Sequence, residues 1–203
     1  MNDTYFVTGI GTGIGKTIVS AIITEKLHAD YWKPIQSGDL DSSDSLKIES
    51  LISNTNSVIH PERFKLTKPL SPHLSAKIDG IELSIQKLSI PETDRNLIIE
   101  GAGGLMVPLN EKELMIDYIQ SLNIKVILVS QNYLGSINHT LLSIEALTSK
   151  GIDLRGIIFN GIANEESQRY IEHYSKARII GHIPLFQTLD KETIKDAGQY
   201  LEF

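Results

Sequence analysis

Short apolar runs alternate along the chain with longer segments in which apolar residues recur at helical spacing. The runs are rich in β-branched residues and apolar at successive positions, which is typical of strands in a parallel sheet covered on both faces. The predicted strands lie at 5–7, 97–99, 126–129, 157–159 and 179–180. The helices that follow them are expected near 16–28, 112–122, 136–150, 164–176 and 190–201. This alternation predicts a three-layer α/β fold with a mainly parallel sheet and helices on both faces.

The segment from 37 to 94 is less regular than the rest of the chain. We expect a helix from about Ser43 to Ile52, followed by mixed loop and short helix among several prolines. No internal repeat, low-complexity tract or linker rich in proline, glycine or serine divides the sequence. Apolar runs recur from Phe6 to Ile183, so we expect residues 1–203 to form one domain around one core.

The composition narrows the possible functions. The 203 residues include no cysteine, which excludes a disulfide-stapled scaffold, a cysteine-ligated metal site and a cysteine nucleophile. The six histidines show no spacing typical of zinc ligands. A net charge of −6 without clustered lysine and arginine argues against general nucleic-acid binding. The chain shows neither a signal-peptide leader nor a long apolar span. We therefore expect a cytoplasmic protein that binds neither nucleic acid nor membrane.

The strongest motif stands between the first predicted strand and the first predicted helix, and reads Thr8-Gly9-Ile10-Gly11-Thr12-Gly13-Ile14-Gly15-Lys16-Thr17. Glycines let backbone N–H groups turn toward phosphate oxygens, and the helix N-terminus adds partial positive charge. In such a phosphate-binding loop (P-loop), Lys16 would reach the β- and γ-phosphates and the Thr17 hydroxyl would bind Mg²⁺. The loop is one residue longer than the common P-loop form. The fold is therefore predicted to be of the P-loop NTPase type.

Two other nucleotide-binding classes fit this loop less well. Both frames of the dinucleotide pattern G-x-G-x-x-G fail, because Ile14 or Lys16 falls where the last glycine belongs. ATPases of the partitioning and division-site type carry a second lysine five residues before the P-loop lysine, and here that position is Gly11. A nucleotide-dependent switch of this type remains the alternative function.

Polar residues near the ends of the predicted strands are candidates to complete the site. Glu100 precedes four small residues that would let a ligand approach the backbone, so it is a candidate metal ligand or an ordinary strand-end acid. Lys33 precedes Pro34 at the end of a predicted second strand and is either functional or a strand-end lysine. Asn160 is either a purine contact or a turn residue. Spacing alone leaves Asp44 as a helix N-cap.

The ordered set of motifs resembles the dethiobiotin synthetase family over most of the chain. The segments that carry the resemblance are 5–9 with Gly15-Lys16-Thr17, Lys33-Pro34-Ile35-Gln36-Ser37-Gly38, Ser71-Pro72-His73, Glu100-Gly101-Ala102-Gly103-Gly104 and Leu134-Gly135-Ser136-Ile137-Asn138-His139. The long P-loop and the missing second lysine are also features of that family. The chain departs from the family at Gly11 and Gly13, where acidic residues are common.

The resemblance implies an ATP- and Mg²⁺-dependent ligase of biotin biosynthesis. In that family, CO₂ and one amine of 7,8-diaminopelargonate give a carbamate, ATP phosphorylates it, and the second amine closes the ring to dethiobiotin. ADP and phosphate are the other products. The family also implies a homodimer whose substrate site is shared between subunits.

The resemblance also implies residue roles. The catalytic residues would be Lys33, Lys16 and Thr12, and the Mg²⁺ ligands would be Thr17, Asp44 and Glu100. The ATP-binding residues would be Gly13, Ile14, Gly15, Lys16, Thr17, Ile18, Asp44, Glu100, Gly101, Ala102, Gly103, Asn160, Gly161, Pro184, Leu185 and Phe186. The substrate would contact Lys33 and Ser37 and, from the neighbouring subunit, Gly135, Ser136, Ile137 and Asn138. We expect both lysines to lie at a solvent-filled site.

Overall fold

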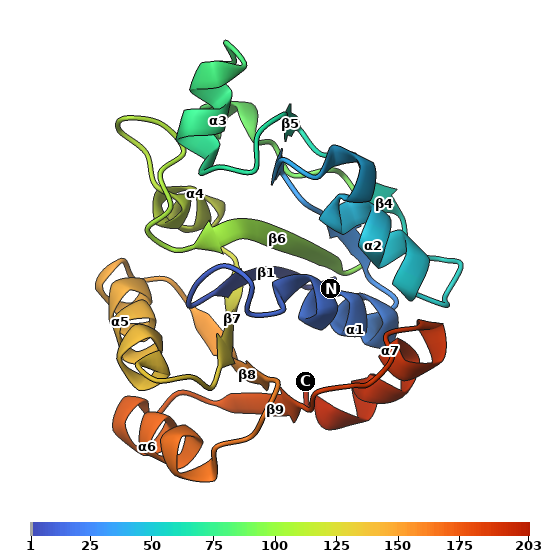
Figure 1. Cartoon of the computed structure of the whole chain (residues 1–203), viewed down its shortest axis with the longest axis vertical. Coiled ribbons are helices and arrows are strands. Elements are labelled where there is room, and N and C mark those ends of the chain that lie inside the picture. The colour runs from blue at the N-terminus through green and yellow to red at the C-terminus, as the bar shows by residue number, and fades with distance from the viewer. Residues whose placement is uncertain (1) are drawn as a thin grey trace.

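A seven-stranded parallel sheet forms the centre of the computed structural model, which describes residues 2–203 (Figure 1). Its strands run in the order β4-β2-β6-β1-β7-β8-β9, and every pairing between neighbours is parallel. The strands are β1 Thr4–Gly9, β2 Asp30–Trp32, β4 Ile59–His60, β6 Leu97–Gly104, β7 Lys125–Gln131, β8 Leu154–Asn160 and β9 Ile179–Ile183. A separate parallel pair is formed by β3 Ile35–Ser37 and β5 Phe64–Leu66.

Helices cover both faces of the sheet, as the apolar pattern predicts. One face carries α1 Lys16–Leu27, α2 Asp44–Leu51 and α7 Lys191–Ala197, and the other carries α4 Met115–Leu122, α5 Ser136–Ser149 and α6 Glu165–Ser175 (Figure 1). Successive residues of β1 serve opposite faces: Val7 packs in the cluster with Ile22 of α1, while Phe6 makes an edge-to-face contact with Tyr118 of α4. The predicted three-layer α/β fold is confirmed.

The remaining elements are short. They are α3 Pro72–Ile78 and three 3₁₀ turns, at Leu40–Ser42, Ile85–Lys87 and Gly198–Tyr200. The irregular segment predicted between 37 and 94 therefore contains little of the main sheet, apart from the edge strand β4.

Several predicted element boundaries differ from the structure. The helix expected from 112 begins at Met115, because Leu109 donates to Glu113 and closes a turn before it. The last helix ends at Ala197, since the chain then tightens into a 3₁₀ turn and Leu201 forms a bridge to Gly181. The strand expected at 97–99 continues to Gly104.

The parallel arrangement brings the carboxyl ends of all main strands to one edge of the sheet. The P-loop follows β1 at this edge, and Lys33 follows β2. Asn160 ends β8, which is paired with β9. β1 lies between β6 and β7, so the P-loop occupies the middle of the edge. Among residues 2–203, no helix has the length and apolar character needed to cross a membrane.

Candidate nucleotide and metal site

The P-loop is fixed by backbone and side-chain contacts on both sides. Ile10 donates its N–H to the Val129 carbonyl of β7 at 3.1 Å, and the Asn160 amide donates to the Ile14 carbonyl at 2.9 Å. Gly15 has a φ of 87°, and a side chain there would collide with Asn160. Asn160 therefore holds the end of the loop immediately before α1 begins. This contact is a role that sequence reasoning missed, and the predicted purine contact stays a prediction.

Lys16 points back into the P-loop. Its ammonium donates to the Gly11 carbonyl at 2.8 Å, and its side chain is buried. Burial lowers the pKa of Lys16 to about 8; the Lys33 ammonium adds to the shift, while the Glu100 carboxylate opposes it. An anion bound in the loop would give Lys16 a negatively charged partner in place of the Gly11 carbonyl and would favour the charged form.

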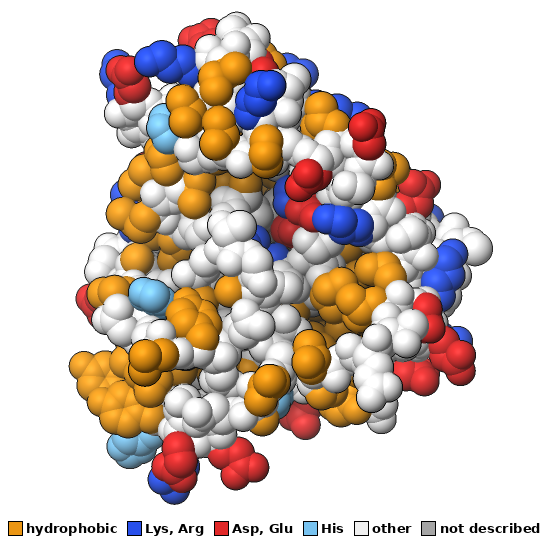
Figure 2. Space-filling model, in the orientation of Figure 1, with side chains coloured by type: hydrophobic (Ala, Val, Ile, Leu, Met, Phe, Trp, Pro, Cys, Tyr) orange, Lys and Arg blue, Asp and Glu red, His pale blue; other side chains and the backbone are white. Residues whose placement is uncertain are grey.

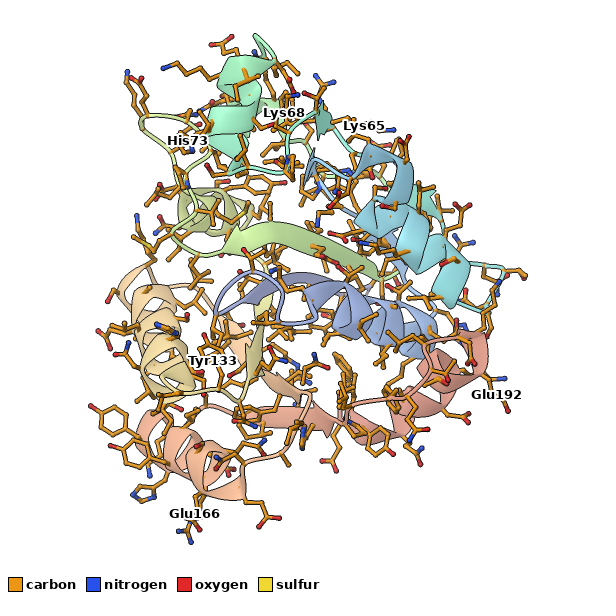
Figure 3. The ribbon with its side chains drawn as sticks, in the orientation of Figure 1. Lys65, Lys68, His73, Tyr133, Glu166 and Glu192 are labelled. Carbon is orange, nitrogen blue, oxygen red and sulfur yellow. The ribbon has the colours of Figure 1, made fainter. Side chains whose placement is uncertain are left out.

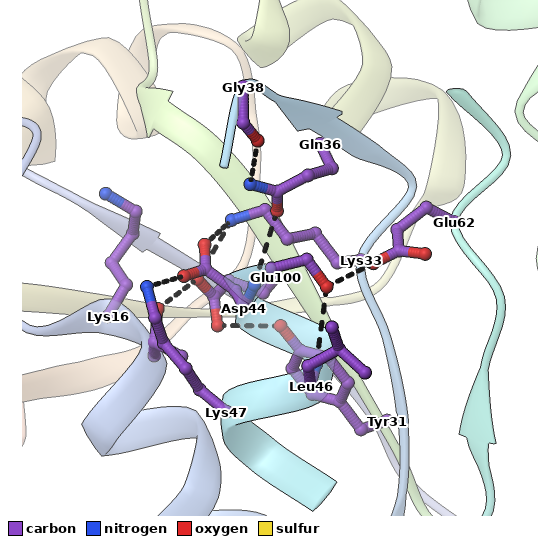
Figure 4. Close-up of polar contacts among 12 residues, drawn as sticks. Lys16, Tyr31, Lys33, Gln36, Gly38, Asp44, Leu46, Lys47, Glu62 and Glu100 are labelled. Atoms are coloured by element: carbon purple, nitrogen blue, oxygen red, sulfur yellow. Dashed lines mark hydrogen bonds and ion pairs between the residues drawn. The ribbon is translucent and has the colours of Figure 1, made fainter. Parts of the chain in front are cut away.

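The three residues predicted to bind Mg²⁺ come together: Asp44 and Glu100 pair with Lys33 (Figure 4), and Thr17 contacts Glu100. The Thr17 hydroxyl donates to Glu100 Oε1 at 3.0 Å, and Lys33 Nζ lies 3.3 Å from the same oxygen. The Lys33 ammonium also forms an ion pair with Asp44. Four separate segments supply these groups: α1, the residue after β2, α2 and β6. We call Thr17, Lys33, Asp44 and Glu100 the acid cluster.

The charges in this cluster stabilise one another. Burial on its own would lower the pKa of Lys33, but Glu100 and Asp44 outweigh that effect and raise it. Burial would raise the pKa of Asp44, but the Lys33 ammonium outweighs it, with help from Lys47 and Thr17, and the pKa falls. Lys33 therefore remains an ammonium and Asp44 a carboxylate near neutral pH.

One sequence-based expectation is wrong here, and the alternative that spacing alone left for Asp44 is excluded. Lys16 and Lys33 are 7% and 5% exposed, so neither side chain lies in a solvent-filled site; the glycine-rich loop and the acid cluster enclose them. Asp44 is not the N-cap of α2, because Ser43 holds that position and its hydroxyl accepts from the Leu46 N–H. The Asp44 carboxylate is thereby free to face Lys33.

The donor set suits Mg²⁺. Carboxylate and hydroxyl oxygens are the hard ligands that Mg²⁺ uses, and it commonly takes one or two carboxylates together with substrate phosphates. Thr17, Asp44 and Glu100 supply two carboxylates and one hydroxyl at a point where a cation, the Lys33 ammonium, is already accommodated. Within the described chain, no cluster of three or more His, Asp or Glu side chains offers a competing metal site.

Tyr31 and Gln36 also belong to the cluster, although sequence reasoning missed both. The Tyr31 hydroxyl donates to Glu100 Oε2 at 3.0 Å, and burial together with the Glu100 carboxylate raises the pKa of this hydroxyl well above its usual value. Gln36 donates to the Gly38 carbonyl at 2.9 Å and accepts from the Asp44 N–H at 3.4 Å. Tyr31 and Gln36 both lie close to Lys33 in the sequence, and this proximity is the one signal that could have indicated a role for them.

The other residues predicted near the P-loop are placed beside it. Thr12 is exposed, and its hydroxyl lies next to Gly103. Ser37 ends β3, and its hydroxyl is buried without a hydrogen-bond partner. The remaining predicted ATP-binding residues in this region lie in the P-loop, the first turn of α1 or the end of β6; they are Gly13, Ile14, Ile18, Gly101, Ala102 and Gly103.

The residues predicted to contact adenine lie on the other side of the P-loop from Lys33. The Gly161 N–H donates to the Ile183 carbonyl at 2.8 Å, which joins the ends of β8 and β9. Pro184, Leu185 and Phe186 follow directly; Leu185 is exposed, while Phe186 packs on Tyr200. The strand order thus separates them from the acid cluster, with β1 in between.

The middle of α5, from His139 to Ala146, lies across a groove from the P-loop. The groove has a volume of about 330 Å³, and its lining includes Gly11, Thr12, Met106, His139 and Leu142. The predicted substrate residues Gly135, Ser136, Ile137 and Asn138 open α5, and Figure 3 shows Tyr133 close to this helix. On the face of the molecule seen in Figure 2, acidic and basic side chains meet in a central hollow.

A P-loop at the carboxyl edge of a parallel sheet, with an acidic residue on the neighbouring strand, defines a P-loop nucleotide-binding protein. Solved structures of this class share the fold. The chain superimposes on a ParA family ATPase from Chlorobium tepidum with a TM-score of 0.61 at 14% identity, covering 99% of this chain and 100% of that one. MinD from Pyrococcus horikoshii, complexed with Mg-ADP, gives 0.59 at 13% identity, covering 97% and 86%.

Sequence relatives define the family. A family profile described as an AAA domain matches residues 3–193. The ATP-dependent dethiobiotin synthetase BioD of Christiangramia forsetii is 53% identical over 98% of this chain and 96% of its own length. That of Cytophaga hutchinsonii is 46% identical over 94% and 92%. The chain belongs to the ATP-dependent dethiobiotin synthetase family, and it is an ATP-dependent ligase of biotin biosynthesis. The likeness to ParA and MinD concerns the fold alone and does not favour the nucleotide-switch alternative.

Proposed function

We propose that this protein, acting as one domain over residues 1–203, makes dethiobiotin from 7,8-diaminopelargonate, CO₂ and ATP with Mg²⁺. The observation that carries the proposal is the position of two buried lysines at the P-loop edge, Lys16 against Gly11 and Lys33 between Asp44 and Glu100. Phosphoryl transfer needs positioning and charge neutralisation, and these groups supply both without a cysteine nucleophile.

Three steps make up the reaction. One amine nitrogen bonds to the carbon of CO₂ and loses a proton, which gives a carbamate. A carbamate oxygen then bonds to the γ-phosphorus of ATP as its bond to the ADP oxygen breaks. Finally, the second amine nitrogen bonds to the carbamoyl carbon, loses a proton and expels phosphate, which closes the ring.

The lysines meet the negative charge that develops during phosphoryl transfer. Lys16 exchanges the Gly11 carbonyl for phosphate oxygens, and Thr12 adds a hydroxyl at the exposed mouth of the loop. Lys33 stabilises the carbamate and the transferring phosphoryl group, and the unpartnered Ser37 hydroxyl contacts substrate nearby. Mg²⁺, held by Thr17, Asp44 and Glu100, would neutralise charge on the β- and γ-phosphates.

The rest of the ligand follows the edge of the sheet. Adenine lies toward Asn160 and Gly161 and the segment 184–186, which the strand order puts on the far side of the P-loop. The diaminopelargonate carboxylate binds the start of α5, residues 135–138, of a second subunit, where helix N–H groups favour an anion. The protein therefore works as a homodimer. We propose that it acts in the cytoplasm.

Phosphate release from MgATP tests the proposal. We expect release only when diaminopelargonate and bicarbonate are both present, together with a product of the mass of dethiobiotin. Phosphate release that needs neither substrate, or no release with both, would contradict the synthetase reaction and would leave a nucleotide-binding protein of another function.

A further inference from the structure

We propose that Tyr31 is a positioning residue that restricts Glu100 to presenting a single oxygen to the divalent cation. The inference rests on the proposed function, because it concerns the site assigned there to Mg²⁺. It adds a residue to that site from outside the sequence motifs, and it makes a statement about which cation the site prefers.

Tyr31 is buried behind Glu100. Its side chain is 0% exposed and packs in the core beside Ile48 of α2 and Ile98 of β6. Tyr31 is in register with Ile98 across the β2–β6 pair, and Glu100 lies two residues further along β6, on the same face of the sheet. This diagonal placement lets the hydroxyl reach Glu100 Oε2 at 3.0 Å.

The two oxygens of Glu100 therefore have different partners. Oε2 accepts from the Tyr31 hydroxyl, within the core. Oε1 accepts from the Thr17 hydroxyl at 3.0 Å and lies 3.3 Å from Lys33 Nζ, on the side of the P-loop (Figure 4). The hydrogen bond from the buried Tyr31 hydroxyl holds one oxygen of Glu100 and opposes rotation of the carboxylate, so the other oxygen faces the P-loop.

This restriction matters for the choice of cation. Mg²⁺ is small, demands near-octahedral geometry and takes few protein oxygens, whereas the larger Ca²⁺ often takes both oxygens of a carboxylate. Outer-shell hydrogen bonds that fix a metal ligand commonly change metal affinity by about 10- to 100-fold. The Tyr31 hydroxyl thus favours Mg²⁺ over Ca²⁺ by withholding Glu100 Oε2.

Tyr31→Phe tests the inference, because it removes the hydroxyl and keeps the ring. Tyr118→Phe is a matched control: Tyr118 is equally buried and donates to the Leu88 carbonyl at 3.1 Å, away from the acid cluster. ATP binding to wild type and both variants is measured by calorimetry across MgCl₂ and CaCl₂ series, without diaminopelargonate. Thermal unfolding verifies that each variant is folded.

In Tyr31→Phe, we expect the Mg²⁺ concentration that gives half-maximal ATP binding to rise by about 10-fold or more. The corresponding Ca²⁺ concentration should rise less. Tyr118→Phe should behave as wild type. An unchanged Mg²⁺ series in Tyr31→Phe, or an equal loss for both cations, would overturn the inference. Failure of the proposed function is a separate result, seen as absence of dethiobiotin with the wild-type protein, because the cation series uses ATP binding and not turnover.

Discussion

Lys33 follows β2, Glu100 lies within the neighbouring strand β6, and the Lys33 ammonium is 3.3 Å from Glu100 Oε1. The lysine assigned to phosphoryl transfer is thereby joined to a carboxylate assigned to Mg²⁺, and the same ammonium also pairs with Asp44. Cation binding and the position of Lys33 are coupled through this contact. A substitution of Lys33 should therefore change cation binding, and removal of the cation should change the surroundings of Lys33.

The first prediction concerns Lys33→Met. Loss of the ammonium should lower turnover by about 10²-fold or more, because it removes charge stabilisation from the transferring group. It also leaves Asp44 and Glu100 close together without their cation, which should cost about 1–3 kcal/mol of stability, less than a fully buried pair since Asp44 is partly exposed. Unfolding in urea with EDTA and with MgCl₂ measures this cost, and we expect Mg²⁺ to restore part of it.

Lys47→Met is the control for that variant. Lys47 also contacts Asp44, at 3.4 Å, but its side chain is half exposed, so its removal should change stability and turnover little. Turnover of Lys33→Met equal to that of Lys47→Met would remove Lys33 from the mechanism.

The second prediction concerns Lys16→Met. Lys16 is the P-loop ammonium, so its removal should weaken ATP binding and reduce turnover by about 10²-fold or more. The folded protein should be retained, since burial already disfavours the charged form of Lys16, whose pKa is lowered to about 8. ATP binding by calorimetry and the melting temperature are measured together. A folded variant with wild-type ATP affinity and turnover would contradict the P-loop role.

The third prediction concerns the shared substrate site. The wild-type protein should sediment as a dimer, and Asn138→Asp should raise the KM for diaminopelargonate, because it adds negative charge where the substrate carboxylate binds. Asn138 is exposed, so the fold should not change. At a diaminopelargonate concentration well below the raised KM, Asn138→Asp and Lys16→Met should each be nearly inactive, yet a mixture that exchanges subunits should regain activity. A fully active monomer, or no recovery in exchanged mixtures, would contradict the shared site.

The fourth prediction is a pH dependence of stability at Glu25. This carboxylate accepts hydrogen bonds from Ser53 and Asn54; burial would raise its pKa, but these bonds outweigh burial and lower it. A lowered acid pKa adds stability above the unfolded pKa of 4.5, and this stability is lost as pH falls through the folded value. Glu25→Gln should therefore cost about 1–2 kcal/mol at pH 7 and progressively less below about pH 4.5.

Urea unfolding between pH 3 and pH 7 measures that dependence. Glu49→Gln, at an exposed position on α2, is the control and should differ little from wild type at any pH. A stability difference for Glu25→Gln that stays constant across this range would show that the charge of Glu25 is not involved.

The sequence by itself determined the layers, the family and the P-loop. Strands that are apolar at successive positions must have both faces of their sheet covered, and each helix must bury its apolar side. Helices packed on both faces of the sheet satisfy both needs. The P-loop is likewise local: Gly15, Lys16 and Thr17 are adjacent, so their spacing alone places an ammonium and a hydroxyl at the start of a helix. The strand order and the pairings of side chains were not readable in this way.

Only the tertiary structure decided how distant side chains meet. Tyr31 and Glu100 are 69 positions apart, and the β2–β6 register brings them into contact. Ser43, and not Asp44, caps α2, and the Asp44 carboxylate pairs with Lys33. Burial of Lys33 also depends on that cluster. Long-range electrostatics and register arise from residues that share no local pattern, which is why the acid cluster emerged from the fold and not from spacing.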